Sequence, residues 1–167
     1  MSESIEFKYL VNYPVDIIES LKENFTNGNL DRYFLKYYSE KHGVSSDKLL
    51  YEFISDLKRQ YLKRSSNLSK ITFDDKITMM NHAFGLHSYT SRSHGNRVIS
   101  KNEIRISSLF KNVPYRFLRM IVVHELAHLK EKEHNRAFYR LCETMEPDYH
   151  RIEFDFRVYL SWKECKS

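Results

Sequence analysis

Three histidines and one glutamate in the last third of the chain have the residue types and spacing needed to activate water on a metal ion. His124 and His128 are four residues apart, with Glu125 directly after the first, in the pattern His-Glu-x-x-His. Four residues span slightly more than one helical turn, so the two imidazoles share one helix face. Two imidazoles placed in this way can bind one zinc ion at about 2.0–2.1 Å. Glu125 then lies beside the metal, where a general base takes a proton from water.

A third histidine, His134, follows His128 by six residues. A continuous helix would place it about 240° around the axis from His128, so the chain must turn after Lys130. Asn135 is a good N-cap residue for a new helix. The sequence therefore predicts zinc on His124, His128 and His134 at a helix junction, with a fourth position open for water, as in catalytic zinc sites.

The alternative is a chance motif on an exposed helix. An apolar stripe favours the metal site, because burial of the motif helix would fix the histidine rotamers. The stripe consists of Leu118, Ile121, Val122, Leu126 and Leu129. The remaining histidines lack metal-ligand spacing and are interpreted as surface or core residues: His42, His82, His87, His94 and His150. Carboxylates that could accept from the ligand rings are Glu103, Glu143, Glu146 and Asp148.

Apolar periodicity predicts helices on both sides of a strand-forming middle segment. The predicted N-terminal helices run from Pro14 to Phe25, from Asp31 to Lys41, and from a cap at Ser45 or Ser46 to Tyr61. Strands are predicted at residues 5–11, near residues 77–83, and in a hairpin of residues 98–99 and 104–107 that turns at Lys101-Asn102. Residues 114–162 are again helical in pattern.

These elements predict a compact α+β domain with N-terminal helices, a small antiparallel sheet and C-terminal helices that carry the histidine motif. The 167 residues suffice for one core. Residues 1–70 are interpreted as a helical extension of the same domain, and residues 71–167 as the catalytic core.

The composition limits the classes of binding partner that the protein is expected to have. The net charge of +5 comes from 27 basic and 22 acidic residues spread along the chain, which is typical of a mixed solvated surface, so nucleic-acid binding is only weakly supported. The 12 tyrosines and 11 phenylalanines fall mostly at helical core spacing. No apolar stretch approaches the roughly 20 residues that cross a bilayer, and the start of the chain lacks a signal pattern. These features predict a cytoplasmic protein without a membrane partner, and nothing in them specifies an oligomeric state.

The segment Phe117–Tyr149 closely resembles the YgjP-like metallopeptidase family, which is related to the SprT-like zincins. The resemblance rests on residues 122–129 (Val-Val-His-Glu-Leu-Ala-His-Leu), His134, residues 137–139 and residues 146–149 (Glu-Pro-Asp-Tyr). It implies a zincin-like fold, zinc on the three histidines and Glu125 as the catalytic base. Residues 91–96 stand where many members carry a Trp-Gly-Ser-Cys segment. Glu131 stands where metzincins have a glycine, which excludes that group.

The predicted function is a zinc-dependent metallopeptidase in which Glu125 activates water to attack a peptide carbonyl. Residues 103–107 would pair with an extended peptide or protein substrate. Candidates to stabilise the oxyanion are Tyr149, His150 and Arg136. One alternative is a zinc hydrolase of nucleotide phosphoanhydrides, with phosphates on Arg119, Arg136 and Arg140. The other is a nucleic-acid-associated protease.

Overall fold

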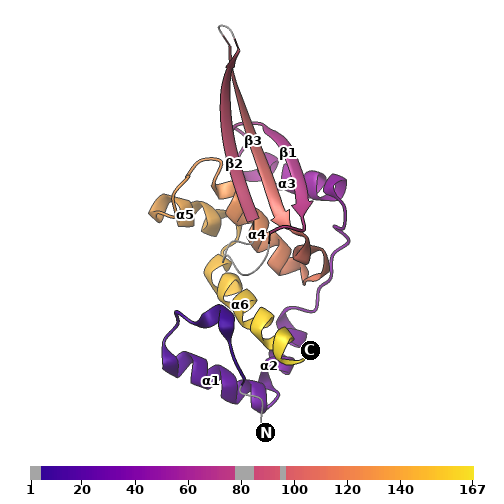
Figure 1. Ribbon diagram of the computed structural model, residues 1–167, viewed down its shortest axis with the longest axis vertical. Helices are drawn as coiled ribbons and strands as arrows, with labels where there is room; N and C mark the ends of the chain where they lie inside the picture. Colours follow the sequence, from indigo (N-terminus) through magenta and orange to yellow (C-terminus); the bar gives the residue numbers. More distant parts are fainter. Residues whose placement is uncertain (1–4, 78–84, 95–96) are drawn as a thin grey trace.

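The computed structural model describes residues 5–77, 85–94 and 97–167, and the side chains among them outside residues 78–101. Helices precede and follow a three-stranded sheet (Figure 1). The elements are η1 (Lys8–Leu10), α1 (Val15–Thr26), α2 (Asn29–Tyr37), α3 (Asp47–Tyr61), β1 (Leu68–Asp74), β2 (Gly85–His94), β3 (Arg97–Ser107), η3 (Ser108–Asn112), α4 (Tyr115–Ala127), α5 (Arg136–Met145) and α6 (Tyr149–Cys165). This mixture of helices and a small sheet confirms the predicted α+β class.

The three predicted N-terminal helices are present. Pro14 starts α1, Gly28 separates α1 from α2 with a positive φ of 70°, and the Ser46 hydroxyl accepts the Leu49 amide to cap α3. Helix α2 ends at Tyr37, earlier than predicted, because Tyr38 leaves the helix to stack on a core phenylalanine.

The strand predicted at residues 5–11 is wrong, since this segment forms the short 3-10 helix η1. Adjacent residues Tyr9 and Leu10 are both buried there. A half-buried strand would point successive side chains to opposite faces and would expose one of these two residues. The turn of η1 allows both to be buried.

The sheet has the strand order β1-β3-β2. Strand β3 pairs antiparallel with β2 and parallel with β1, so the predicted antiparallel pairing holds for the hairpin and is wrong for β1. The sheet is mixed because β2 lies between β1 and β3 in the sequence but occupies the far edge of the sheet, which lets the chain return alongside β1 in the same direction. Strand β3 is therefore central, and both of its sides are paired from Asn102 to Ile106.

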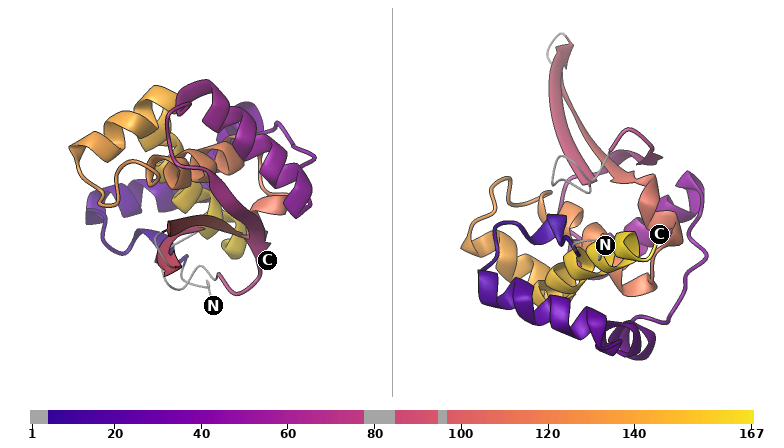
Figure 2. Two further views of the ribbon diagram at one scale, coloured as in Figure 1. Left: turned by 90° about the horizontal axis from the view of Figure 1, so that it is seen from above. Right: turned by 60° about the horizontal axis from the view of Figure 1, so that its bottom comes forward.

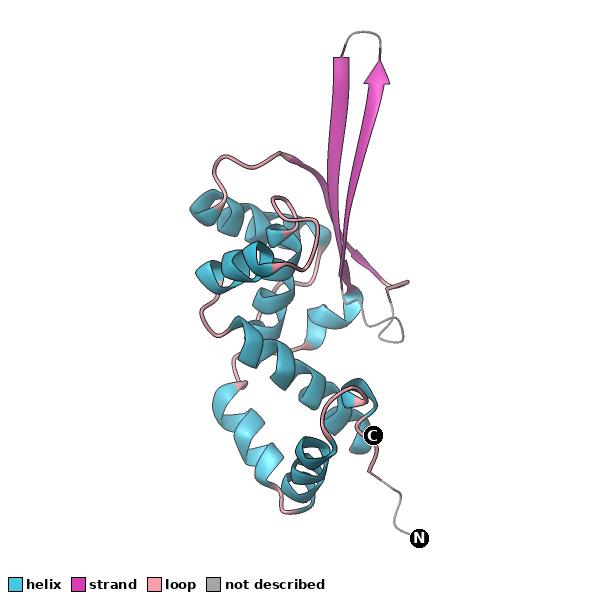
Figure 3. Cartoon of the chain, turned by 90° about the vertical axis from the view of Figure 1, so that its left-hand side faces the viewer, coloured by secondary structure: helices cyan, strands magenta, loops and turns pink. Residues whose placement is uncertain are grey.

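The hairpin predicted to turn at Lys101-Asn102 is wrong, because β3 runs without interruption through both residues. Asn102 is held in the strand by tertiary contacts: its carbonyl accepts the Ser69 hydroxyl at 2.9 Å, and its side chain is buried. The reversal falls instead between His94 and Arg97, which pair with each other. The resulting β2–β3 hairpin extends beyond the helices (Figure 3). The strand predicted near residues 77–83 lies almost wholly outside the described residues.

Helix α4 lies at the centre of the C-terminal part and contacts β2, β3, α5 and α6. Its buried side chains include Leu118, Val122 and Leu126. Ile104 and Ile106 of β3 are fully buried, whereas Arg105 between them is partly exposed, which gives the strand one core face. Helices α1 and α2 lie beside α6, away from the sheet (Figure 2). Buried residues of the N-terminal helices and of the C-terminal part belong to one hydrophobic cluster.

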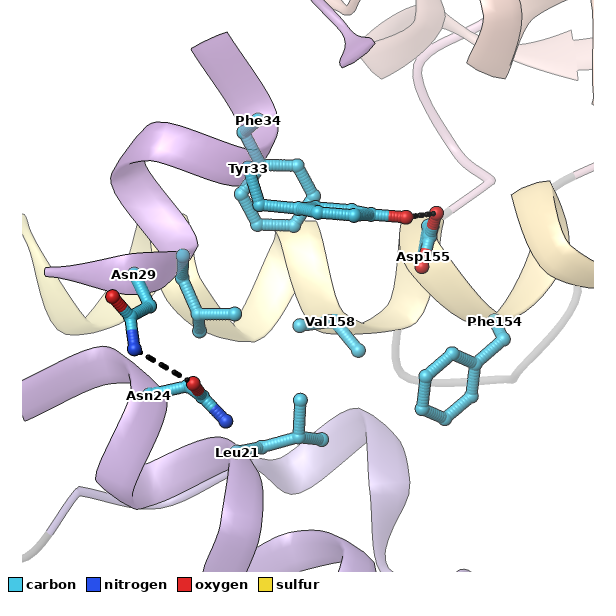
Figure 4. A pocket seen from close by; sticks show the side chains of 9 residues that line it. Leu21, Asn24, Asn29, Tyr33, Phe34, Phe154, Asp155 and Val158 are labelled. Atoms are coloured by element: carbon cyan, nitrogen blue, oxygen red, sulfur yellow. Dashed lines mark hydrogen bonds between the residues drawn. The ribbon is translucent and has the colours of Figure 1, made fainter. Parts of the chain in front are cut away.

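A pocket lies between α1, α2 and α6 and is lined mainly by apolar side chains (Figure 4). Asp155 of α6 lies at its wall and accepts the hydroxyls of Tyr33, at 2.7 Å, and Tyr38, at 2.5 Å. These two hydrogen bonds join α2 and the residue that follows it to α6, so the buried carboxylate has a structural role there. Among the described residues, no helix is long and apolar enough to cross a membrane.

Candidate metal centre

Helix α4 carries the first two histidines on a rigid support. It begins after Pro114, which suits a helix start, and its apolar residues are buried on more than one side. His124 lies within the last turn, and His128 is the C-cap residue. The predicted apolar stripe is therefore buried on α4, with Leu129 beyond the helix only partly buried, and it fixes the positions from which both imidazoles project.

The chain turns after α4 as the spacing requires. The amides of Lys130 and Glu131 both donate to the Ala127 carbonyl, at 3.1 and 3.0 Å, which ends the helix in a tight turn. Asn135 then starts α5, and its side-chain oxygen accepts the Phe138 amide at 2.9 Å. His134 lies at this junction, immediately before the new N-cap, where the sequence predicted it.

The three Nε2 atoms converge. The distance is 3.3 Å between His124 and His128, 3.2 Å between His124 and His134, and 3.1 Å between His128 and His134. A tetrahedral ion about 2.0–2.1 Å from each nitrogen would separate them by about 3.3 Å. The three residues form a group that could hold a metal ion, and their spacing fits zinc.

The opposite ring nitrogens are already engaged. Nδ1 of His128 lies 3.0 Å from the Glu131 carbonyl oxygen, and Nδ1 of His124 lies 2.7 Å from the Tyr149 hydroxyl. A carbonyl can only accept, so the neutral His128 ring carries its proton on Nδ1 and directs the Nε2 lone pair toward the other two rings. A metal ligand needs this tautomer.

The predicted carboxylates are not the acceptors for His124 and His128, and three of them bind other side chains. Glu146 binds Arg119 at 3.0 Å, Asp148 binds Arg116 and Arg151, and Glu143 binds His150 at 3.0 Å. The fourth, Glu103, lies on β3. No periodic pattern in the sequence predicts a backbone carbonyl and a tyrosine hydroxyl as the acceptors. Only the motif Glu-Pro-Asp-Tyr hinted that Tyr149 mattered.

Phe138 closes the inner side of the cluster. Its ring centroid lies 4.9, 4.6 and 4.8 Å from the rings of His124, His128 and His134, and its side chain is fully buried. His134 is exposed, whereas the other two rings are partly buried. An ion on the three nitrogens would therefore have its open position on the outer side, within reach of a substrate.

Burial holds His124 in the neutral state. Desolvation, together with the neighbouring His128 and His134, lowers the pKa of His124 to about 3. His124 is thus neutral at any pH near 7, and metal binding needs no proton to leave it.

Glu125 is buried beside the ligands without a compensating partner. Its side chain is 2% exposed, and its Oε2 atom has no hydrogen-bond partner among the described residues. Desolvation raises the pKa of this carboxyl to about 8. A buried carboxyl with an unpartnered oxygen, in the residue that follows a histidine of the converging group, is the kind of perturbed group that occurs at active sites.

Several other residues singled out from the sequence have different roles in the structure. Tyr149 is 2% exposed and lies behind His124, so its prediction as an oxyanion donor is wrong. Residues 103–107 belong to the central strand, so their predicted pairing with a substrate is also wrong. His42 binds the Phe110 carbonyl, which confirms its interpretation as a structural residue.

The three predicted phosphate-binding arginines divide into two groups. Arg119 donates to Glu146 and, at 2.7 Å, to the Met145 carbonyl, which commits its guanidinium to the structure. Arg136 and Arg140 are exposed on α5, four residues apart, and form no ion pair with a described residue. Their spacing puts both on one helix face, close in sequence to His134.

Comparison with known proteins supports this reading of the motif. Residues 13–157 match the family model described as YgjP-like, metallopeptidase domain. A protein of Escherichia coli (strain K12) named UTP pyrophosphatase is 44% identical over 153 residues, which cover 92% of this chain and 92% of that protein. No solved structure matches.

The buried Glu125 makes the stability of the metal-free protein depend on pH. Its folded pKa of about 8 lies above the ordinary 4.5, so the folded state binds the proton more tightly and loses stability as the pH rises between these values. His124 has the opposite sign, and its contribution changes between about 3 and 6.5. Between pH 6.5 and 8, only Glu125 of this pair destabilises the fold. With a chelator present, we expect the melting temperature of the wild type to fall across this window.

Glu125→Gln removes the titrating group and should flatten that fall. Equal slopes for the wild type and the variant between pH 6.5 and 8 would contradict the burial of an uncompensated carboxyl at this position.

Proposed function

Because the chain belongs to the YgjP-like metallopeptidase-domain family, we propose that it binds zinc through His124, His128 and His134 and hydrolyses a phosphoanhydride bond of a nucleoside triphosphate, with UTP the first substrate to test. The family and the relative support a metal-dependent hydrolase, which agrees with the sequence prediction at that level. The observation that carries the finer proposal is the 44% identity to a UTP pyrophosphatase over nearly the whole of both chains.

Glu125 is the proposed general base. When bound, zinc supplies a Lewis acid that lowers the pKa of water and polarises a phosphoryl oxygen. A cation beside Glu125 also favours its ionised form, which reverses the effect of burial and makes it a proton acceptor at neutral pH. Glu125 takes a proton from water as the water oxygen bonds to the α-phosphorus. The bond from that phosphorus to the oxygen bridging to the β-phosphorus breaks, and the products are a nucleoside monophosphate and pyrophosphate.

Arg136 and Arg140 are proposed to bind the phosphates that leave. Both guanidiniums are exposed without a described carboxylate partner, whereas Arg119 is already paired. They lie on α5, whose first residue follows His134 by two positions. The positive end of this helix dipole also favours a negatively charged ligand near the metal. A planar guanidinium can donate two parallel hydrogen bonds to a phosphate.

Peptide hydrolysis is a second candidate, because the matched family is described as a metallopeptidase domain. The same base and metal would attack a carbonyl carbon in place of phosphorus. Strand β2 is an edge strand of the sheet and contacts α4, so it offers the backbone pairing that the central strand β3 cannot. The substrate, rather than the proton transfer, distinguishes the two candidates.

The direct test of the proposed base is Glu125→Gln. We expect zinc-loaded wild type to convert UTP to UMP and pyrophosphate, and the variant to retain zinc while kcat falls about 10²–10⁴-fold. Glu52→Gln, on the exposed side of α3, serves as a matched control that keeps wild-type turnover. A variant that turns over UTP at the wild-type rate would remove Glu125 as the base. Cleavage of a peptide library without hydrolysis of UTP would select the second candidate.

The phosphate-binding role of α5 is tested with Arg136→Gln and Arg140→Gln. Loss of one charged hydrogen-bond donor costs about 1.5–3 kcal/mol, so KM for UTP should rise about 10–100-fold in each variant. Zinc content should not change, because neither arginine contacts a histidine ring. Arg59→Gln, an exposed arginine of α3 that pairs with Asp56, is the control. An unchanged KM in both α5 variants would exclude this face from substrate binding.

A further inference from the structure

Tyr149 links the candidate metal centre to the corner between α5 and α6. Its hydroxyl lies 2.7 Å from His124 Nδ1, and its side chain is 2% exposed. It is the first residue of α6 and lies 25 residues after His124. No predicted ligand or base accounts for a buried tyrosine whose polar atom points at the back of a ligand ring.

The chemistry of metal binding gives this contact a direction. An imidazole that binds a metal through Nε2 must carry its remaining proton on Nδ1, and that N–H needs an acceptor when it is buried. The Tyr149 oxygen is at the distance of a strong hydrogen bond. Burial raises the pKa of Tyr149, so the hydroxyl keeps its own proton and accepts as a neutral group.

Helix α4 itself holds the corner that places Tyr149. Arg119 binds Glu146 and the Met145 carbonyl, and Arg116 binds Asp148 at 3.1 Å. These arginines precede His124 on the same helix, so the helix that carries the ligand also fixes the segment that carries its hydrogen-bond partner. This explains why Arg119 is committed to the corner and not available to a substrate.

We propose that Tyr149 is a positioning residue that holds the His124 ring in the orientation and tautomer needed to bind the metal through Nε2. In this role the Tyr149 hydroxyl accepts the Nδ1 proton of His124, as the Glu131 carbonyl accepts the Nδ1 proton of His128. The inference rests on the metal centre of the proposed function and is independent of which substrate is hydrolysed.

The test compares Tyr149→Phe with Tyr38→Phe in zinc affinity, measured by competition with a chromophoric chelator at pH 7.5. Both variants keep the aromatic ring and lose one buried hydroxyl group. The Tyr38 hydroxyl donates to Asp155 of α6 and does not contact a metal-ligand histidine. Tyr149→Phe should bind zinc about 10–100-fold more weakly, the usual effect of losing an outer-shell partner. Tyr38→Phe should stay within about 2-fold of the wild type, since no ligand loses its partner. Equal zinc affinity for Tyr149→Phe and the wild type would overturn the proposal.

A second measurement needs no variant and so does not depend on how Tyr149→Phe folds. Nitrogen-15 histidine spectra of the metal-free wild type should show His124 with its proton on Nδ1. A proton on Nε2 of His124 would overturn the proposal, because Tyr149 would then be donating to the ring. A wild type with no zinc affinity would overturn the metal centre itself, whereas a zinc-binding wild type matched by Tyr149→Phe would overturn only this role of Tyr149.

Discussion

Three imidazole nitrogens lie within 3.1–3.3 Å of one another, and this convergence depends on the helices and the turn that surround them. One helix of any length could supply only two of them, because His134 would otherwise point away from the others. The tight turn at Ala127 and the cap at Asn135 solve this problem by ending one helix and starting the next at the required place. Phe138 packs against all three rings, so a residue of the hydrophobic core also forms one side of the candidate metal centre.

The same packing makes the site electrostatically costly in the absence of a metal. A buried carboxyl oxygen without a hydrogen-bond partner costs about 1–3 kcal/mol, and Oε2 of Glu125 is such an atom. A divalent cation on the histidines would relieve this cost and would couple metal binding to stability and to the basicity of Glu125. These groups would serve a phosphoanhydride or a peptide equally well. The neighbouring elements are compatible with both substrates: β3 is paired on both sides but β2 is an edge strand, and Arg136 and Arg140 are exposed without an ion pair to a described residue.

The sequence predicted the parts of this arrangement that follow from local spacing. The three N-terminal helices and the histidine junction at Asn135 could be derived, because helical periodicity and capping act over a few residues. The family was identified from its resemblance to known sequences around the histidine motif. The errors concern tertiary contacts. Lys101-Asn102 has the composition of a turn but lies within β3, because β1 pairs with that strand. Tyr149 was predicted to contact the substrate but lies behind His124, because α6 places it there. The boundary at residue 70, the cytoplasmic location and the association with nucleic acid stay predictions.

The most direct test of the central claim is the zinc content of purified wild type and His134→Ala, determined by elemental analysis after dialysis at neutral pH. Three converging ligands predict about one zinc per chain in the wild type. They also predict loss or strong weakening of binding in the variant, because two histidines on one helix end do not complete the site. Zinc bound equally by both proteins, or by neither after zinc is supplied, would contradict a metal centre built on His124, His128 and His134.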